Sequence, residues 1–138
     1  MKIVVISFMV TIFSIVNLHC VQAQSDHSEE QALEIVKVFY TGYITYVDKG
    51  DLPKLEAFQK KYCTPKLFKK IPELGNKIDQ DPFLKAQDSN IKFLQSLVVQ
   101  KDNKKEGHYI VSYGTDEKIV INLTVVKMNG NYEIDNVW

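Results

Sequence analysis

The sequence has 138 residues, and its 17 lysines balance 17 aspartates and glutamates, so the formal net charge is zero at pH 7. Arginine is absent. Because the chain has neither a basic excess nor the bidentate guanidinium donors that suit phosphates, nucleic-acid binding is disfavoured. The length is sufficient for one domain of ordinary size and too short for two.

The first 23 residues are typical of an export signal. Lys2 is followed by an apolar run, Ile3 to Leu18, which a few polar residues interrupt. Val21-Gln22-Ala23 then places small or β-branched side chains at the two positions that signal peptidase reads, which predicts cleavage after Ala23. A membrane anchor is the alternative, but a span needs about 20 apolar residues.

A lipoprotein signal is a further alternative, but it would need a small residue where His19 precedes Cys20. We therefore expect residues 1–23 to be removed. Residues 24–138 would then form a single domain that is exported to the periplasm or secreted, with no membrane attachment after cleavage. Cys63 would remain as a free thiol at a helix end, with no disulfide partner.

Three helices are predicted in the first half of the domain. Ser28 and Gln31 form a capping box ahead of a long helix with a wide apolar face, which ends at Asp48-Lys49-Gly50. Asp51, with Pro53 in the first turn, starts a second helix, whose buried stripe is expected to be Leu52, Leu55, Phe58 and Tyr62. Thr64-Pro65 starts a short third helix, which Pro72 is expected to end.

The hydrophobic period then changes from helical to alternating. Four strands are predicted at Ile91–Gln100, His108–Tyr113, Lys118–Val126 and Tyr132–Trp138. Asn129-Gly130 has the signature of a type I′ hairpin turn between the last two. The predicted fold class is therefore α+β, with one long and two short helices packed on one face of a curved four-stranded antiparallel sheet.

This pattern resembles the nuclear-transport-factor-2-like, or ketosteroid-isomerase-like, cone superfamily. The long helix with Phe39-Tyr40 and Tyr43, the Asp81-Pro82-Phe83-Leu84-Lys85-Ala86-Gln87-Asp88 segment and the closing Tyr132 to Asn136 segment are also similar to a family of small secreted proteins of unknown function from Gram-negative bacteria. The resemblance implies a cone-like domain and export. It implies no activity, because this fold hosts enzymes, binding proteins and assembly modules.

Five residues are candidates for a binding site in such a cone: Tyr40, Tyr43, Asp81, Asp88 and Asn136. Tyrosine hydroxyls can supply the few polar contacts that an apolar pocket needs, although ordinary core packing is the simpler interpretation of these rings. Asp79, Asp81 and Asp88 do not follow the spacing of a calcium loop, and an aspartate before proline is typical of a turn. No metal site, cofactor or catalytic residue is predicted.

The leading functional hypothesis is an exported, non-enzymatic binding module for a small apolar ligand or a protein partner. A small enzyme that transfers protons with a tyrosine and an aspartate, such as Tyr40 with Asp88, is the alternative. An immunity-type partner without a pocket is a third possibility. Apolar residues on both faces of the predicted strands, including Leu94, Val98, Val120 and Val126, also predict a homodimer through the outer face of the sheet.

The leader gives the first testable prediction. The exported protein should begin at Gln24, because the Val-Gln-Ala site lies directly behind the apolar run. Mass analysis of the N-terminus of protein purified from its native host would test this. An intact, membrane-embedded start would contradict it.

Overall fold

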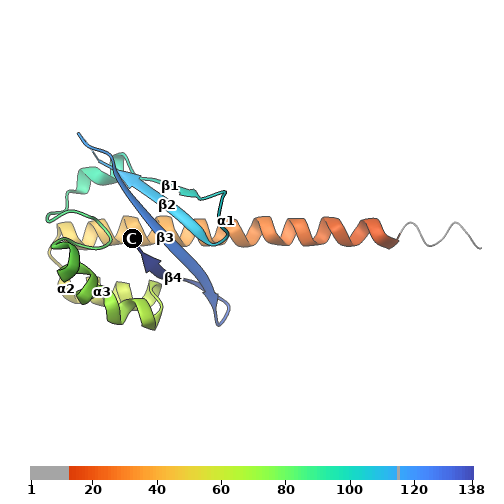
Figure 1. The fold of residues 1–138 in the computed structure, drawn as a ribbon, viewed down its shortest axis with the longest axis horizontal. Helices are drawn as coiled ribbons and strands as arrows, with labels where there is room; N and C mark the ends of the chain where they lie inside the picture. The colour runs from red at the N-terminus through yellow and green to blue at the C-terminus, as the bar shows by residue number, and fades with distance from the viewer. Residues whose placement is uncertain (1–12, 115) are drawn as a thin grey trace, which may run out of the picture. The chain divides into compact units, whose positions relative to one another are not determined.

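The structure is a computed structural model and describes residues 13–114 and 116–138. The chain divides into residues 1–31 and a compact unit, Ala32–Trp138. Three α-helices pack against a four-stranded antiparallel sheet of order β1-β2-β3-β4, which does not close into a barrel (Figure 1). The expected α+β class is thereby confirmed. None of the helices in the described ranges is long and apolar enough to cross a membrane.

The first helix, α1 (Phe13–Asp48), begins earlier than predicted. Ser28 and Gln31 lie inside it and do not mark its start, and the predicted polar lead-in is helical too. The physical reason is that no glycine or proline interrupts the chain between Phe13 and Thr41, so nothing stops the helix from extending toward the leader. Residues 1–12 of the predicted leader lie outside the described residues.

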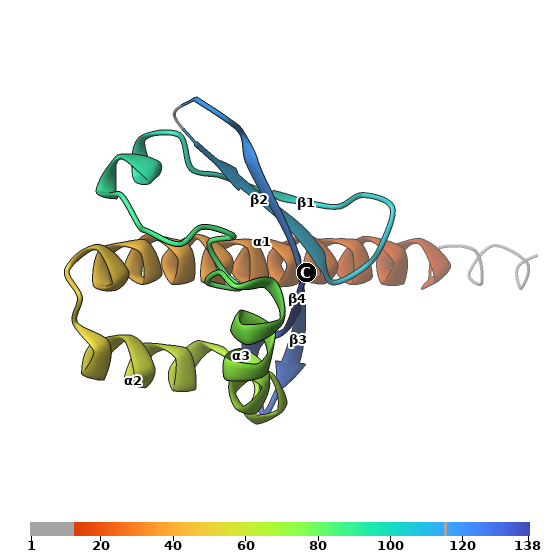
Figure 2. The same ribbon diagram turned by 60° about the vertical axis from the view of Figure 1, so that its left-hand side comes forward.

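The second helix, α2 (Leu52–Tyr62), begins as predicted, with the Asp51 side chain accepting a hydrogen bond from the Lys54 amide. It lies beside α1 (Figure 2). This close approach depends on Gly42 of α1, because a Cβ there would lie 2.3 Å from Cζ of Phe58. Leu52 was expected in the buried stripe, but its exposed fraction is 69%. It is the first helical residue and lies before the turn that faces the core.

The third helix, α3 (Pro65–Ile78), is capped by Thr64 as predicted, but it continues past Pro72. Its apolar side, including Ile71 and Leu74, packs against the core on both sides of this proline. Pro72 itself is exposed. Packing of the continued apolar face therefore outweighs the missing amide hydrogen bond.

The predicted first strand is divided in two by the structure. A 3₁₀-helix, η1 (Ile91–Gln95), comes first, and β1 (Val98–Lys101) is a short edge strand. Asn90 causes the change: its side chain accepts a hydrogen bond from the Lys92 amide, and its carbonyl accepts one from Phe93. Local hydrogen bonding by asparagine thus overrides the alternating pattern.

The other strands confirm the predicted meander. They are β2 (His108–Tyr113), β3 (Ile119–Met128) and β4 (Asn131–Val137), paired antiparallel in chain order. A bulge in the β3–β4 ladder turns Asp135 away from the pairing and toward Thr64 and Lys66, which both donate hydrogen bonds to it.

The hairpin between β3 and β4 has the predicted two-residue turn. Both central residues have positive φ, +51° at Asn129 and +84° at Gly130. This combination is that of a type I′ turn, which matches the twist of the two strands.

Gly130→Val should therefore lower the free energy of unfolding by about 1–3 kcal/mol, the scale of local backbone strain. The cause would be φ alone, because a Cβ at Gly130 meets nothing within 4 Å. Gly130→Asn is the matched control, since asparagine tolerates positive φ and should cost much less. Chemical denaturation would compare the three proteins. Equal stability of the valine variant would contradict the assigned turn.

Candidate functional site

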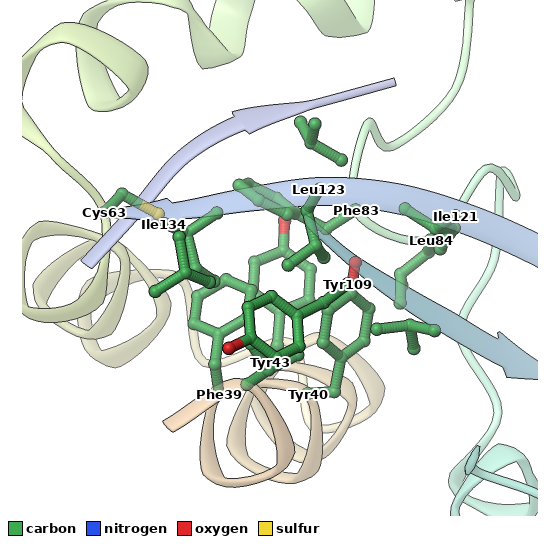
Figure 3. Close-up of a cluster of buried hydrophobic side chains, with 14 of the residues drawn as sticks. Phe39, Tyr40, Tyr43, Cys63, Phe83, Leu84, Tyr109, Ile121, Leu123 and Ile134 are labelled. Atoms are coloured by element: carbon green, nitrogen blue, oxygen red, sulfur yellow. The ribbon is translucent and has the colours of Figure 1, made fainter. Parts of the chain in front are cut away.

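The inner face of the sheet is covered by a cluster of aromatic side chains centred on Phe39 (Figure 3). The Phe39 ring lies within 6.2 Å, centroid to centroid, of five other rings: Tyr40, Tyr43, Phe58, Tyr62 and Phe83. The exposed fraction of Tyr40 and of Phe83 is 0%, and that of Tyr43 is 1%. The aromatic face of α1 is therefore part of the hydrophobic core.

One carboxylate enters this aromatic cluster. The Tyr43 hydroxyl donates a hydrogen bond to Oδ2 of Asp81 at 2.8 Å, and Nε2 of Gln59 lies 3.2 Å from the same hydroxyl. These three side chains come from α1, α2 and the segment that follows α3. The Asp81–Tyr43 contact thus connects parts of the chain that are 38 residues apart.

The other oxygen of Asp81 holds the turn that follows it. Oδ1 accepts hydrogen bonds from the amides of Phe83 at 2.8 Å and Leu84 at 3.0 Å. The Leu84 carbonyl in turn accepts a hydrogen bond from the Tyr113 hydroxyl of β2. The prediction that Asp81, before a proline, caps a turn is confirmed. Its second role, as the acceptor for Tyr43, was not predicted.

Burial dominates the electrostatics of this cluster. Desolvation raises the pKa of Asp81 above that of a free carboxyl, although its hydrogen bonds from Tyr43, Phe83 and Leu84 partly offset this effect. Burial and the charge of Asp81 also raise the pKa of Tyr43, so its hydroxyl stays a hydrogen-bond donor. The Tyr40 hydroxyl is buried and has no hydrogen-bond partner within the described part of the chain.

The structure brings together three of the five predicted site residues. Tyr40, Tyr43 and Asp81 lie in one cluster, where electrostatic coupling reaches from Asp81 to both tyrosines. Asp88 and Asn136 are exposed and do not belong to this buried cluster. Whether any of the five contacts a ligand stays a prediction.

Other candidates for chemistry give no second site. Over residues 13–114 and 116–138, no three histidine, cysteine or acidic side chains are grouped so that they could hold a metal ion. Cys63 is a buried free thiol at the end of α2, as expected. Burial, together with the charge of Glu133, raises the pKa of Cys63 to about 12, so the reactive thiolate is suppressed near neutral pH.

The geometry also bears on the enzyme hypothesis. Tyr40 is fully buried, whereas Asp88 is exposed, so the pair named for proton transfer does not share one environment. Asp135 is engaged by Thr64 and Lys66. The pair that the sequence suggested for proton transfer is therefore not formed.

The outer face of the sheet has a different composition. The register aligns three cross-strand rows on this face: Val98, Ser112 and Val120; Gln100, Ile110 and Asn122; and His108, Thr124 and Asn136. Trp138 pairs with Asn122 through the backbone, and its ring lies 5.4 Å from that of His108. We call these ten residues the neutral outer face, because none of them is lysine, aspartate or glutamate, although 25% of the chain is charged.

Large apolar side chains are exposed on this face. The exposed fractions are 51% for Val98, 42% for Val120 and 44% for Trp138. The alternation of the strands had predicted apolar residues on both faces, and Val98 and Val120 lie as expected. Leu94 does not: it belongs to η1 and packs against the core. The contact of Trp138 with His108 had no signal in the sequence, because it depends on strand register.

The buried carboxyl gives a prediction on pH dependence. Because the folded-state pKa of Asp81 is raised, the folded state binds this proton more tightly than the unfolded state does. The contribution of Asp81 to the free energy of unfolding is therefore most favourable at low pH. This contribution declines as the pH rises from the ordinary carboxyl pKa of 3.8 through the raised pKa of the folded state.

Asp81→Asn removes this titration but keeps an oxygen that can accept the two amide hydrogen bonds. The stability of the wild type, relative to this variant, should fall with rising pH in that window and then level off. Urea denaturation of both proteins at several pH values would measure the difference. A difference that does not change with pH would show that Asp81 titrates normally.

Comparison with solved structures places the fold among bacterial proteins. The chain is similar to a protein of unknown function from Bacteroides thetaiotaomicron, with a TM-score of 0.76 and 25% identity over 88% of this chain and 98% of that one. It is also similar to a chain of the type VI effector-immunity complex Tae3–Tai3 from Ralstonia pickettii, with a TM-score of 0.62 and 18% identity over 75% of this chain and 90% of that one.

No family model matches the chain, and no curated protein does either. The likeness to the Ralstonia chain shows the fold alone. Membership of the nuclear-transport-factor-2-like superfamily therefore stays a prediction.

Proposed function

We propose that this protein is an exported, non-enzymatic binding module, and that a protein partner docks on the neutral outer face of its sheet. The observation that carries the proposal is the absence of lysine, aspartate and glutamate from three adjacent cross-strand rows that also expose Val98, Val120 and Trp138. Depletion of charge and enrichment in aromatic residues are the features that distinguish the centre of a protein–protein interface.

The arrangement of this face suits a protein partner. Trp138 and His108 are in edge-to-face contact at one end of the face, and Val98 and Val120 flank Ser112 at the other. Ser112 is itself buried, but the other polar residues of the face carry hydroxyl and amide groups, which can exchange hydrogen bonds with a partner without the cost of burying a charge. Tryptophan is also over-represented among the residues that contribute most to binding.

The inner cluster supports a protein partner over a small apolar ligand. Tyr40 and Tyr43 pack against Phe39 and Phe83, and all four side chains are at most 1% exposed. A ligand that contacted these rings would have to displace core side chains. A docked protein needs no such rearrangement on the outer face.

The structural neighbours are consistent with this proposal. The Ralstonia chain comes from a complex between an effector and its immunity protein. That partner is not carried over to this chain, because the similarity shows the fold alone. A fold that occurs in such a complex nevertheless agrees with the third functional possibility derived from the sequence, an immunity-type partner protein without a pocket.

A second copy of the chain is the other candidate occupant of the same face, as the apolar residues on both faces of the strands had predicted. The ten residues of this face carry no lysine, aspartate or glutamate, and an ammonium group that reaches it, that of Lys85, donates to the Val120 carbonyl. Two copies can therefore meet here with little like-charge repulsion, and a two-fold homodimer would cover Val98 and Val120. The experiment must therefore separate a different protein from a second copy.

A photo-crosslinking amino acid at Val120 would make this test in the native host. Irradiation should give an adduct between this protein and a partner, because the position lies within the proposed interface. The same amino acid at Lys37, an exposed position on α1, is the matched control. Mass spectrometry of the adduct would show whether the partner is another protein or the chain itself.

The two possible partners have different consequences. An adduct with another protein from Val120, but not from Lys37, would support the proposed module. An adduct of the chain with itself, together with a dimer in sedimentation that dissociates on dilution, would replace it with the homodimer. Equal adducts from both positions, or none from either, would contradict a specific interface on this face.

A further inference from the structure

The neutral net charge of the chain conceals a local excess of lysine on two helices. Together α2 and α3 comprise 25 residues, with seven of the 17 lysines of the chain and two of its 17 acidic residues. Considered separately, the pairs Lys60-Lys61 and Lys69-Lys70 indicate ordinary solvated helix faces. In the fold, the two helices that carry these pairs contact one another.

The lysines of α3 lie on one side of the helix. Lys66, Lys69, Lys70 and Lys77 have the spacing of a single helical stripe, and all four are exposed. Exposed Glu73 lies in the same stripe, between Lys70 and Lys77, so the stripe carries four lysines and one glutamate. The opposite side, with Leu67 and other apolar residues, packs into the core. The stripe runs over about three turns, or roughly 16 Å.

One lysine of α2 reaches across to α3. Nζ of Lys60 lies 5.3 Å from the centroid of the Phe68 ring, so one ammonium group of α2 lies against α3. We define the lysine surface as Lys60, Lys61, Lys66, Lys69, Lys70 and Lys77.

Ion pairs within the protein neutralise only part of this surface. Lys60 pairs with Glu56 at 2.7 Å, and Lys66 pairs with Asp135. Lys69, Lys70 and Lys77 form no salt bridge with any side chain of the described residues. Partial burial opposes ionisation of Asp135, but the hydrogen bonds from Lys66 and Thr64 lower its pKa, and the charge of Lys70 adds to this effect from a distance.

We propose that the lysine surface binds a carboxylate-rich segment of a partner protein. Lysine ammonium groups are compact, mobile point charges that pair with carboxylates without a fixed geometry, and the stripe is long enough to follow an acidic helix or strand. This contact is separate from the neutral outer face, because the helices that carry it cover the inner side of the sheet. The domain would then offer one neutral and one basic docking surface.

Two other anionic partners fit the lysine surface less well. Single-stranded nucleic acids stack their bases on exposed aromatic rings, whereas Phe58, Tyr62 and Phe68 of these helices pack against the core. A membrane-surface helix inserts its apolar side into the lipid, but the apolar side of α3 is already covered.

Fluorescence anisotropy with a labelled deca-glutamate peptide would test the proposal on the purified protein. Binding is expected at low ionic strength and should weaken as salt is added, because the screening length falls from about 30 Å at 0.01 M to about 8 Å at 0.15 M. The variant Lys69→Glu/Lys70→Glu should weaken binding by about tenfold or more, since it replaces two attractions with two repulsions.

The matched control is Lys104→Glu/Lys105→Glu, an adjacent exposed pair in the β1–β2 loop with the same change in net charge. Its affinity for the peptide should stay within about twofold of the wild type. Equal losses of peptide affinity in both variants would show a response to net charge alone and would overturn the proposal. The proposal would also be overturned if single-stranded DNA or vesicles of anionic phospholipid bound more tightly than the peptide and this binding depended on Lys69 and Lys70.

Discussion

The Asp81 carboxylate is partly buried beside an aromatic core, and a polar group that loses water in this way needs other hydrogen-bond partners. Its two oxygens meet this requirement with groups from different parts of the chain: the Tyr43 hydroxyl on one side, and the amides of Phe83 and Leu84 on the other. Tyr43 is also in hydrogen-bond contact with Gln59 of α2. Satisfying one carboxylate therefore fixes how α1, α2 and the turn after Asp81 fit together.

The same turn controls how the sheet is covered. Because Asp81 holds the turn closed, Phe83 and Leu84 enter the core with at most 1% of their surface exposed, and the Leu84 carbonyl meets the Tyr113 hydroxyl of β2. At the other side of the sheet, the Thr64 amide donates to the Ile134 carbonyl, so the edge of β4 is partly covered where α2 ends. The first connection lies on the inner face and the second at the β4 edge, and neither involves the outer face.

The two layers consequently differ in the chemistry that they present. Strand alternation places every large core residue of β2 and β3 inward, so the outer positions are determined by what remains between them: valine, isoleucine, hydroxyl and amide side chains. The exposed sides of α2 and α3 carry lysine instead. A net charge of zero is the sum of these unlike surfaces, and for that reason the composition alone does not indicate either of them.

What the sequence by itself determined is local. Asp51, Thr64 and Asn129-Gly130 specify two helix starts and a hairpin because caps and tight turns depend on neighbouring residues, and alternation placed β2 to β4 within about two residues. Tertiary structure decided the rest. Pro72 stays within α3 because packing continues beyond it, and Asp81 reaches Tyr43 across 38 residues. The pairing of Trp138 with His108 and the joining of two lysine-bearing helices arise in the same way, since each requires segments that only the folded chain brings together.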